Sequence, residues 1–214
     1  SAKSKHWASF YNSQNFNLEN LKNFRNSKSQ LSAGLDTSGS NLSFKLYSEI
    51  INKISENYLL YNLPKENIGN SDFLISYKNF FVDPIKLTHI YWFWIIENKI
   101  LKKHKINNIC EIGGGFGSFL ELFIKNYSTK IFLIDLPEAN LMSAYYLKKL
   151  FPEKKYYLFN NYIEKEYLSK SDFDGNDVII LPPNCKIDKE IKIDFFVNTR
   201  SMMEMNFETI KSYF

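Results

Sequence analysis

Cysteine and histidine are scarce in this chain. Of its 214 residues, only Cys110 and Cys185 are cysteines, and three are histidines. Two cysteines cannot form the framework of a secreted disulfide-rich domain, and Cys110 falls in a predicted buried strand. No spacing of histidines and carboxylates forms a recognisable metal-ligand set, so we predict no metal site. With no visible signal peptide, we expect a cytoplasmic protein.

Long hydrophobic runs and basic blocks are also lacking. The most apolar run, at 90–96, is far shorter than the roughly 20 residues that a membrane span needs, so we expect a buried helix and no span. The net charge is +4, from 27 basic and 23 acidic residues, and the lysines are scattered. No basic block accompanies a stacking motif, which argues against nucleic acid as a partner.

The apolar fraction of 44% is ordinary for a globular chain of this length. We expect two regions: a mainly helical N-terminal cap at 1–104 and an α/β domain at 105–214. In the cap, residues up to about 30 are polar apart from a helix near 18–24. Apolar residues at a helical period predict an amphipathic helix over 44–61. An extended piece is expected at 73–81, and Asp83 with Pro84 opens a helix through about 103.

Strands and helices alternate in the second region. Strands are expected at 108–112, 130–134, 178–181 and 193–197, with an extended piece at 156–159. Helices are expected at 118–125, 137–150, 162–168 and from about 206. This alternation predicts a parallel sheet with right-handed crossovers, that is, a Rossmann-like α/β fold.

A glycine motif follows the first of these strands. Gly113, Gly115 and Gly117 form G-x-G-x-G, and Asp135 ends the second strand. Strand, glycine turn, helix, strand and acid make the first half of a nucleotide-binding unit. A dinucleotide fingerprint, G-x-G-x-x-G, would need glycine at Ser118, which disfavours an NAD-dependent oxidoreductase. An unrelated α/β protein, with Asp135 as a helix N-cap, remains the alternative.

The G-x-G-x-G form resembles the first motif of class I S-adenosylmethionine (SAM)-dependent methyltransferases. Within them, the chain is similar to the bacterial sugar O-methyltransferase family at 111–117, 134–147, 181–183 and 194–205. The resemblance implies SAM as cofactor and methyl transfer to a hydroxyl of a sugar. The substrate would be a small molecule or glycan of surface polysaccharide or glycoconjugate synthesis.

The same resemblance implies roles for the residues of the motif. The glycines would line the methionine and ribose parts of SAM, and Asp135 would accept hydrogen bonds from the ribose. Glu111 could order the loop or face the cationic end of the ligand. The residue after strand three often contacts adenine. That residue is Asn184 if strand three is 178–181, although many relatives carry Asp there, and Asn160 or Asn161 if it is 156–159. We favour Asn184.

Residues after strand four usually face the substrate. The candidate site residues here are Asn198, Arg200 and Glu204. We assign Asn198 to cofactor binding. A sugar hydroxyl needs help to lose its proton, and Glu204 is the best candidate for the base, with a solvated helix carboxylate as the alternative. His89, among apolar residues of the cap, is the second catalytic candidate, with a core position as the alternative.

A complete class I sheet has seven strands, but the sequence after Val197 has room for one helix. We therefore expect the sheet to lack its last strands and the chain to be truncated. Exchange of elements in a dimer, or replacement by the N-terminal segment, would also complete the sheet. The sequence leaves open a homo-oligomer, as well as a degenerate methyltransferase that serves as a non-catalytic binding or assembly module.

Overall fold

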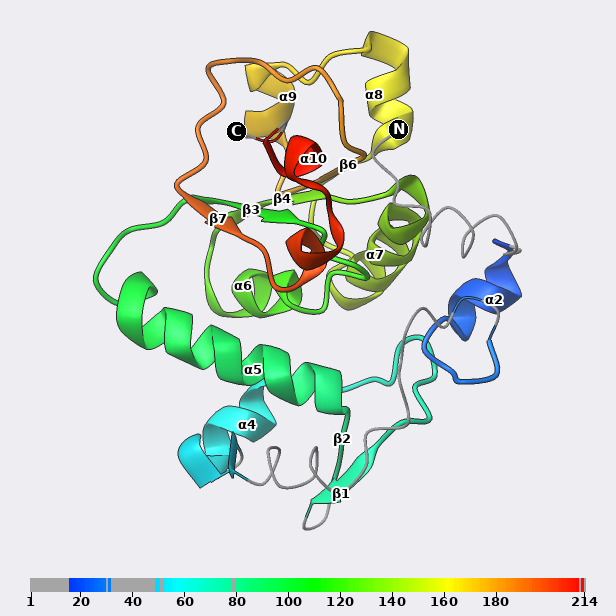
Figure 1. Ribbon diagram of the computed structural model, residues 1–214, viewed down its shortest axis with the longest axis vertical. Helices are drawn as coiled ribbons and strands as arrows, with labels where there is room; N and C mark the ends of the chain where they lie inside the picture. The colour runs from blue at the N-terminus through cyan, green and yellow to red at the C-terminus, as the bar shows by residue number, and fades with distance from the viewer. Residues whose placement is uncertain are drawn as a thin grey trace. The chain divides into compact units, whose positions relative to one another are not determined.

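The computed structural model describes residues 16–29, 31, 49–50, 52–77, 80–211 and 213. The chain divides into two compact units, with the boundary between Lys105 and Ile106 (Figure 1). In the part of the chain that the structure describes, no helix is long and apolar enough to cross a membrane. The two units are considered separately.

The unit before Ile106 combines short helices with a hairpin. Its elements are α2 (Leu18–Lys22), α4 (Glu56–Asn62), β1 (Ile75–Tyr77), β2 (Phe80–Val82), α5 (Pro84–Ile96) and the π-helix η1 (Glu97–Leu101). The strands β1 and β2 pair antiparallel, so the extended piece expected at 73–81 is a two-stranded hairpin. The helix expected from Pro84 is present, but its last turn is π-helical.

The helix expected over 44–61 is not continuous. Residues 49–50 and 52–53 are helical, but Ser55 is extended, with ψ at 147°, and α4 begins only at Glu56. The Ser55 side chain accepts a hydrogen bond from the Tyr58 backbone N–H, which makes it the N-cap of a new helix. Hydrophobic periodicity alone did not reveal this interruption; residues 44–48 and 51 lie outside the described residues.

A buried polar cluster holds the start of α5. The Asp83 carboxylate caps the helix by accepting from the backbone N–H groups of Ile85 at 2.7 Å and Lys86 at 3.1 Å. Its other oxygen accepts from the Arg25 guanidinium and from the Ser71 hydroxyl, the latter at 3.1 Å. Arg25, Ser71 and Asp83 are all buried, so their mutual hydrogen bonds offset the cost of removing them from water.

The unit from Ile106 onward contains a five-stranded parallel sheet, as expected for α/β alternation. Its strand order is β5-β6-β4-β3-β7. The strands are β3 (Asn108–Ile112), β4 (Lys130–Ile134), β5 (Tyr156–Tyr157), β6 (Val178–Leu181) and β7 (Phe195–Val197). The helices are α6 (Leu120–Asn126), α7 (Pro137–Leu150), α8 (Phe159–Lys165), α9 (Lys170–Gly175), the 3-10 helix η2 (Ser201–Glu204) and α10 (Phe207–Lys211). This architecture is compatible with a Rossmann-like fold.

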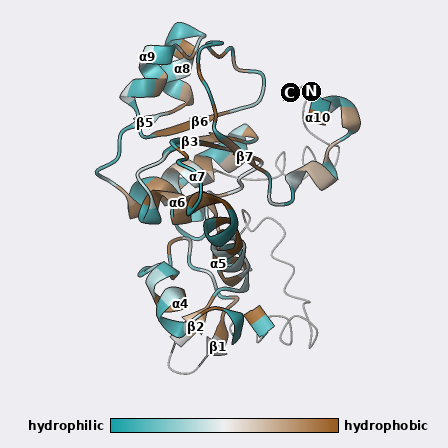
Figure 2. Ribbon diagram, turned by 90° about the vertical axis from the view of Figure 1, so that its left-hand side faces the viewer, coloured by the Kyte–Doolittle hydropathy of each residue, from teal (hydrophilic) through white to brown (hydrophobic). Residues whose placement is uncertain are grey.

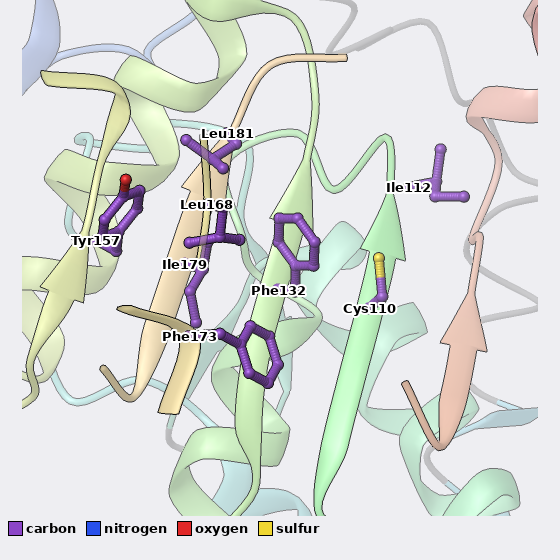
Figure 3. Packing of buried hydrophobic residues seen from close by; sticks show 8 residues of the cluster. All are labelled: Cys110, Ile112, Phe132, Tyr157, Leu168, Phe173, Ile179 and Leu181. Atoms are coloured by element: carbon purple, nitrogen blue, oxygen red, sulfur yellow. The ribbon is translucent and has the colours of Figure 1, made fainter. Parts of the chain in front are cut away.

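Helices cover both faces of this sheet. In Figures 1 and 2, α6 and α7 lie on one face, and α8 and α9 lie on the other. Figure 2 colours β6 as hydrophobic, and all four of its residues are buried, which is typical of a parallel strand covered on both faces. Figure 3 shows one core layer, in which side chains from four strands meet residues from the segment around α9. This layer contains Cys110, Ile112, Phe132, Tyr157, Leu168, Phe173, Ile179 and Leu181.

Two elements of this unit were not predicted from the sequence, and others begin elsewhere than expected. Both α9 and η2 are new, and α8 begins at Phe159 rather than 162. Helix α6 begins at Leu120, because the loop after the third glycine continues through Ser118 and Phe119 as turns. The Lys130 ammonium donates to the carbonyl groups of Phe173 at 2.7 Å, Asp174 at 3.0 Å and Asn176, which stabilises the end of α9.

Candidate functional site

The glycine loop leaves the sheet at a reversal of strand order. From β3 the chain proceeds to β4 on one side and later returns to place β7 on the other side of β3. In open parallel sheets, ligands bind at the carboxyl ends of the strands beside such a switch point. The segment 113–117 follows the carboxyl end of β3, so it occupies the position where a ligand is expected.

The three glycines of the motif adopt a backbone conformation that other residues rarely take. Their φ angles are 73° at Gly113, 56° at Gly115 and 84° at Gly117. The loop is fixed to the sheet by a hydrogen bond of 2.7 Å from the Gly113 N–H to the Ile134 carbonyl. An L side chain at any of these positions would introduce strain of about 1–2 kcal/mol.

The glycines differ in what surrounds them. A Cβ atom at Gly113 would overlap the side chain of Ser201, and one at Gly117 would lie 3.1 Å from Leu147 of α7. At Gly115 no atom of the described residues lies within 4 Å of that position. Gly113 and Gly117 therefore allow close packing of the protein on itself, whereas Gly115 leaves the backbone accessible to a partner.

Asp135 is hydrogen-bonded to the glycine loop. One carboxylate oxygen accepts from the Gly115 N–H at 2.7 Å, and the other accepts from the Leu136 N–H at 2.7 Å. Burial raises the pKa of Asp135 to about 6 against the lowering effect of these two bonds, and the charges of Glu138 and Glu204 add to the rise. The acid predicted to bind a ribose thus also shapes the loop.

Glu111 is buried beside the same loop. It is 1% exposed, and one of its oxygens accepts a 3.3 Å hydrogen bond from the Thr199 hydroxyl. The other oxygen, Oε2, is buried, has no hydrogen-bond partner in the described part of the chain, and lies 3.0 Å from where a Cβ at Gly114 would be. Burial, with a smaller contribution from the charge of Asp135, raises the pKa of Glu111 to about 8 against the lowering effect of the Thr199 hydrogen bond.

The segment after β7 folds over the carboxyl end of β3. The Asn198 side-chain amide donates to the Ile112 carbonyl and to the Ser201 hydroxyl, both at 2.6 Å, and its oxygen accepts from the Met202 N–H. The Ser201 hydroxyl also donates to the Ile112 carbonyl, at 3.0 Å. Asn198 is therefore at the site but serves to anchor η2. Thr199 and Ser201 were not predicted as site residues; the only signal was their place in the run 194–205.

The adenine candidates are distinguished by strand pairing. The strand that pairs with β4 is β6 (Val178–Leu181), which makes it the third strand. The strand β5 (Tyr156–Tyr157) pairs with β6 and lies at the edge of the sheet. Asn184 lies in the turn after β6, exposed, with φ at 70°. Asn160 and Asn161 belong to α8, and the Asn161 side chain accepts from the Leu158 N–H. Asn184 therefore follows the strand that pairs with β4, and its contact with adenine stays a prediction.

The two catalytic candidates lie in different units. Glu204 ends η2, is exposed, and is close enough to Asp135 for its charge to raise the pKa of that acid. His89 lies in α5, where its ring centroid is 5.6 Å from that of Trp92. Within the unit that contains the glycine loop, Glu204 is therefore the candidate near the site.

Among the described residues, no group of three or more His, Cys, Asp or Glu side chains could hold a metal ion. Comparisons with protein-family models and with curated proteins find no match to this chain. The function must therefore be inferred from the site itself.

Proposed function

We propose that this protein is a SAM-dependent methyltransferase. The observation that carries the proposal is the position of the third glycine. Gly117 has a positive φ and packs against Leu147, whereas Ser118 is buried behind it at 2% exposure. The conformation of the loop therefore suits the spacing G-x-G-x-G, and Asp135, after the next strand, accepts a hydrogen bond from the middle glycine, Gly115.

The charge around the loop argues against a dinucleotide. A pyrophosphate favours an accessible helix N-terminus. Here α6 begins with Phe119 as its N-cap and Leu120 as its first residue, and both are buried. An acid at the position of Asp135 is common to dinucleotide sites, but the loop also has the buried carboxyl group of Glu111 beside it, which in its ionised form would repel phosphate. A ligand with cationic groups and no phosphate fits these surroundings better.

The residues of the loop provide binding groups that suit SAM. Each carboxylate oxygen can accept two hydrogen bonds, so Asp135 retains capacity for ribose hydroxyls after binding Gly115 and Leu136. The unpartnered Oε2 of Glu111 suits a cationic ammonium group. The open space at Gly115 allows a ligand to approach the backbone closely.

For the acceptor, we propose a sugar hydroxyl. The support is the resemblance of 194–205 to sugar O-methyltransferases and the location of Glu204 at the end of that segment. Bound SAM would supply an electrophilic methyl group, and the protein would align the acceptor oxygen and exclude water. Glu204 would accept the hydroxyl proton as the oxygen attacks.

Calorimetry with SAM tests the cofactor. We expect binding by the full chain and its loss in Asp135→Ala, because the ribose and the loop both lose their acceptor. Asp177→Asn is a matched control. Asp177 lies before the first residue of β6, at the amino ends of the strands and thus away from the glycine loop, and it accepts a hydrogen bond from the Lys155 N–H at 2.9 Å. No SAM binding by the folded chain, or binding of NADH instead, would overturn the proposal.

Methyl transfer is tested separately. Mass spectrometry of sugar acceptors incubated with SAM and the protein should detect a methylated product, and Glu204→Gln should slow its formation while leaving SAM affinity unchanged. SAM binding with no transfer to any sugar would favour a non-catalytic binding module instead.

A further inference from the structure

Glu111 and Asp135 form a pair of acids at the ends of neighbouring strands, and further acidic groups among the described residues act on this pair. The charge of Asp135 acts on Glu111, and those of Glu138, at the start of α7, and Glu204, at the end of η2, act on Asp135. The other titratable neighbours are Cys110 of β3, which the charge of Glu111 affects, and Tyr213, which that of Asp135 affects. Thr199, after β7, donates the hydrogen bond to Glu111.

One oxygen of Glu111 lacks a hydrogen bond. Oε2 is buried against Gly114 with no donor among the described residues, which costs free energy whenever the carboxyl group is ionised. Protonation lowers this cost by neutralising the group. A cationic donor brought to the loop would remove it as well, while keeping the group ionised.

We propose that a cationic ligand binds at the glycine loop with release of a proton from Glu111. The Glu111 O–H bond breaks, the proton passes to solvent, and the carboxylate forms an ion pair with the ligand. This inference rests on the proposed SAM function, because SAM carries a sulfonium and an ammonium group. It adds that the affinity of this site depends on pH and that its ligands are selected by positive charge.

The direction of the pH dependence follows from linkage. Below its pKa in the free protein, Glu111 must lose its proton for the ion pair to form, and this opposes binding. With a pKa of about 8 in the free protein, the affinity of the site should rise by about tenfold from pH 6 to 7 and by about fivefold from pH 7 to 8. The α-amino group of the ligand itself titrates near pH 8 and acts in the opposite direction.

Calorimetric titration with SAM at pH 6, 7 and 8 tests the inference, with Glu111→Gln as the central variant. Glutamine resembles the protonated acid, so the ratio of the affinity of the unaltered protein to that of the variant should grow from pH 6 to pH 8, by up to about fiftyfold. Loss of the ligand's ammonium charge near pH 8 reduces this growth, because only the charged ligand forms the ion pair with Glu111. At pH 7, buffers of different ionisation enthalpy should report release of about one proton in the unaltered protein and less in the variant.

Two further variants and a second ligand sharpen the test. Thr199→Val removes the bond that lowers the pKa of Glu111, so the rise in affinity should move to higher pH. Glu121→Gln is the matched control, because Glu121 is also buried but accepts from the Tyr146 hydroxyl at 2.6 Å; its pH profile should not change. Adenosine, which lacks the positive charge, should show the same pH profile in the unaltered protein and in Glu111→Gln.

The outcomes are distinguishable. The same pH dependence of SAM affinity in the unaltered protein and in Glu111→Gln would overturn this inference and leave the proposed cofactor intact. Absence of SAM binding at every pH would overturn both. Circular dichroism of each variant is the check that the proteins compared are folded.

Discussion

Replacing Gly113 with alanine should destabilise the unit that contains the parallel sheet. The added Cβ would overlap both Oγ and Cβ of Ser201, so η2 would have to move away from the loop. Ser201 would then lose its hydrogen bonds to the Ile112 carbonyl and the Asn198 amide, each worth about 1 kcal/mol. Strain at a φ of 73° adds about 1 kcal/mol, the lower end of its usual range, for a total of about 3 kcal/mol.

Gly115→Ala is the matched control. It introduces a similar positive-φ strain, at 56°, but its Cβ meets nothing within 4 Å. We expect a cost of about 1 kcal/mol, so the two alanine variants should differ by about 2 kcal/mol.

Hydrogen exchange of β3 and β7 amides is the suitable assay, because the chain has two compact units and global unfolding need not be two-state. A difference of 2 kcal/mol corresponds to about thirtyfold faster exchange in Gly113→Ala than in Gly115→Ala. Ser201→Gly should restore part of the loss in a double-mutant cycle. Equal exchange in the two alanine variants, or no coupling between positions 113 and 201, would refute the packing of η2 on the loop.

Three further predictions concern stability. Lys130→Met should cost about 1–3 kcal/mol, seen as faster amide exchange in α9, because three carbonyl groups at the end of that helix lose their donor; unchanged exchange would contradict this. Asp83→Asn should cost about 3 kcal/mol in urea unfolding, because Arg25 becomes a buried charge without its carboxylate; Glu56→Gln, at the exposed start of α4, should have little effect. The raised pKa of Glu111 means that the folded state holds this proton more tightly than the unfolded state. Its contribution to stability is therefore present below pH 4.5 and is lost as the pH rises to about 8, so Glu111→Gln should be more stable than the unaltered protein at pH 8 by a few kcal/mol in urea unfolding.

The sequence predicted the centre of the sheet correctly because local signals were strong there. The strands β3, β4 and β6 and the helix α7 have the expected bounds, since each is a short apolar run or a long helical pattern between clear breaks. The position of Asp135 at the end of β4 followed from the same pattern. Its bond to Gly115, 20 residues away, depends on how the two strands pair and could not be read from either segment alone.

The part of the site that was missed depends on contacts between distant residues. The run 201–204 has no helical period, and η2 forms because Asn198 binds the Ile112 carbonyl, 86 residues earlier. Thr199 reaches Glu111 across 88 residues. Neither contact leaves a trace in local spacing, so Thr199 and Ser201 could not be distinguished from ordinary loop residues before the sheet was assembled.

Glu111 can be recognised as a site residue because its buried carboxyl group lowers the stability of the fold. A glutamine would fill the same space, accept the hydrogen bond from Thr199, and avoid both the buried charge and its pH-dependent loss of stability. The carboxyl group therefore gives the free protein nothing that an amide would not give. What it adds is the capacity to hold a negative charge beside Gly114 when a cation arrives. A buried acid that weakens the fold as the pH rises, at the switch point of a parallel sheet, is best explained by a ligand that it binds.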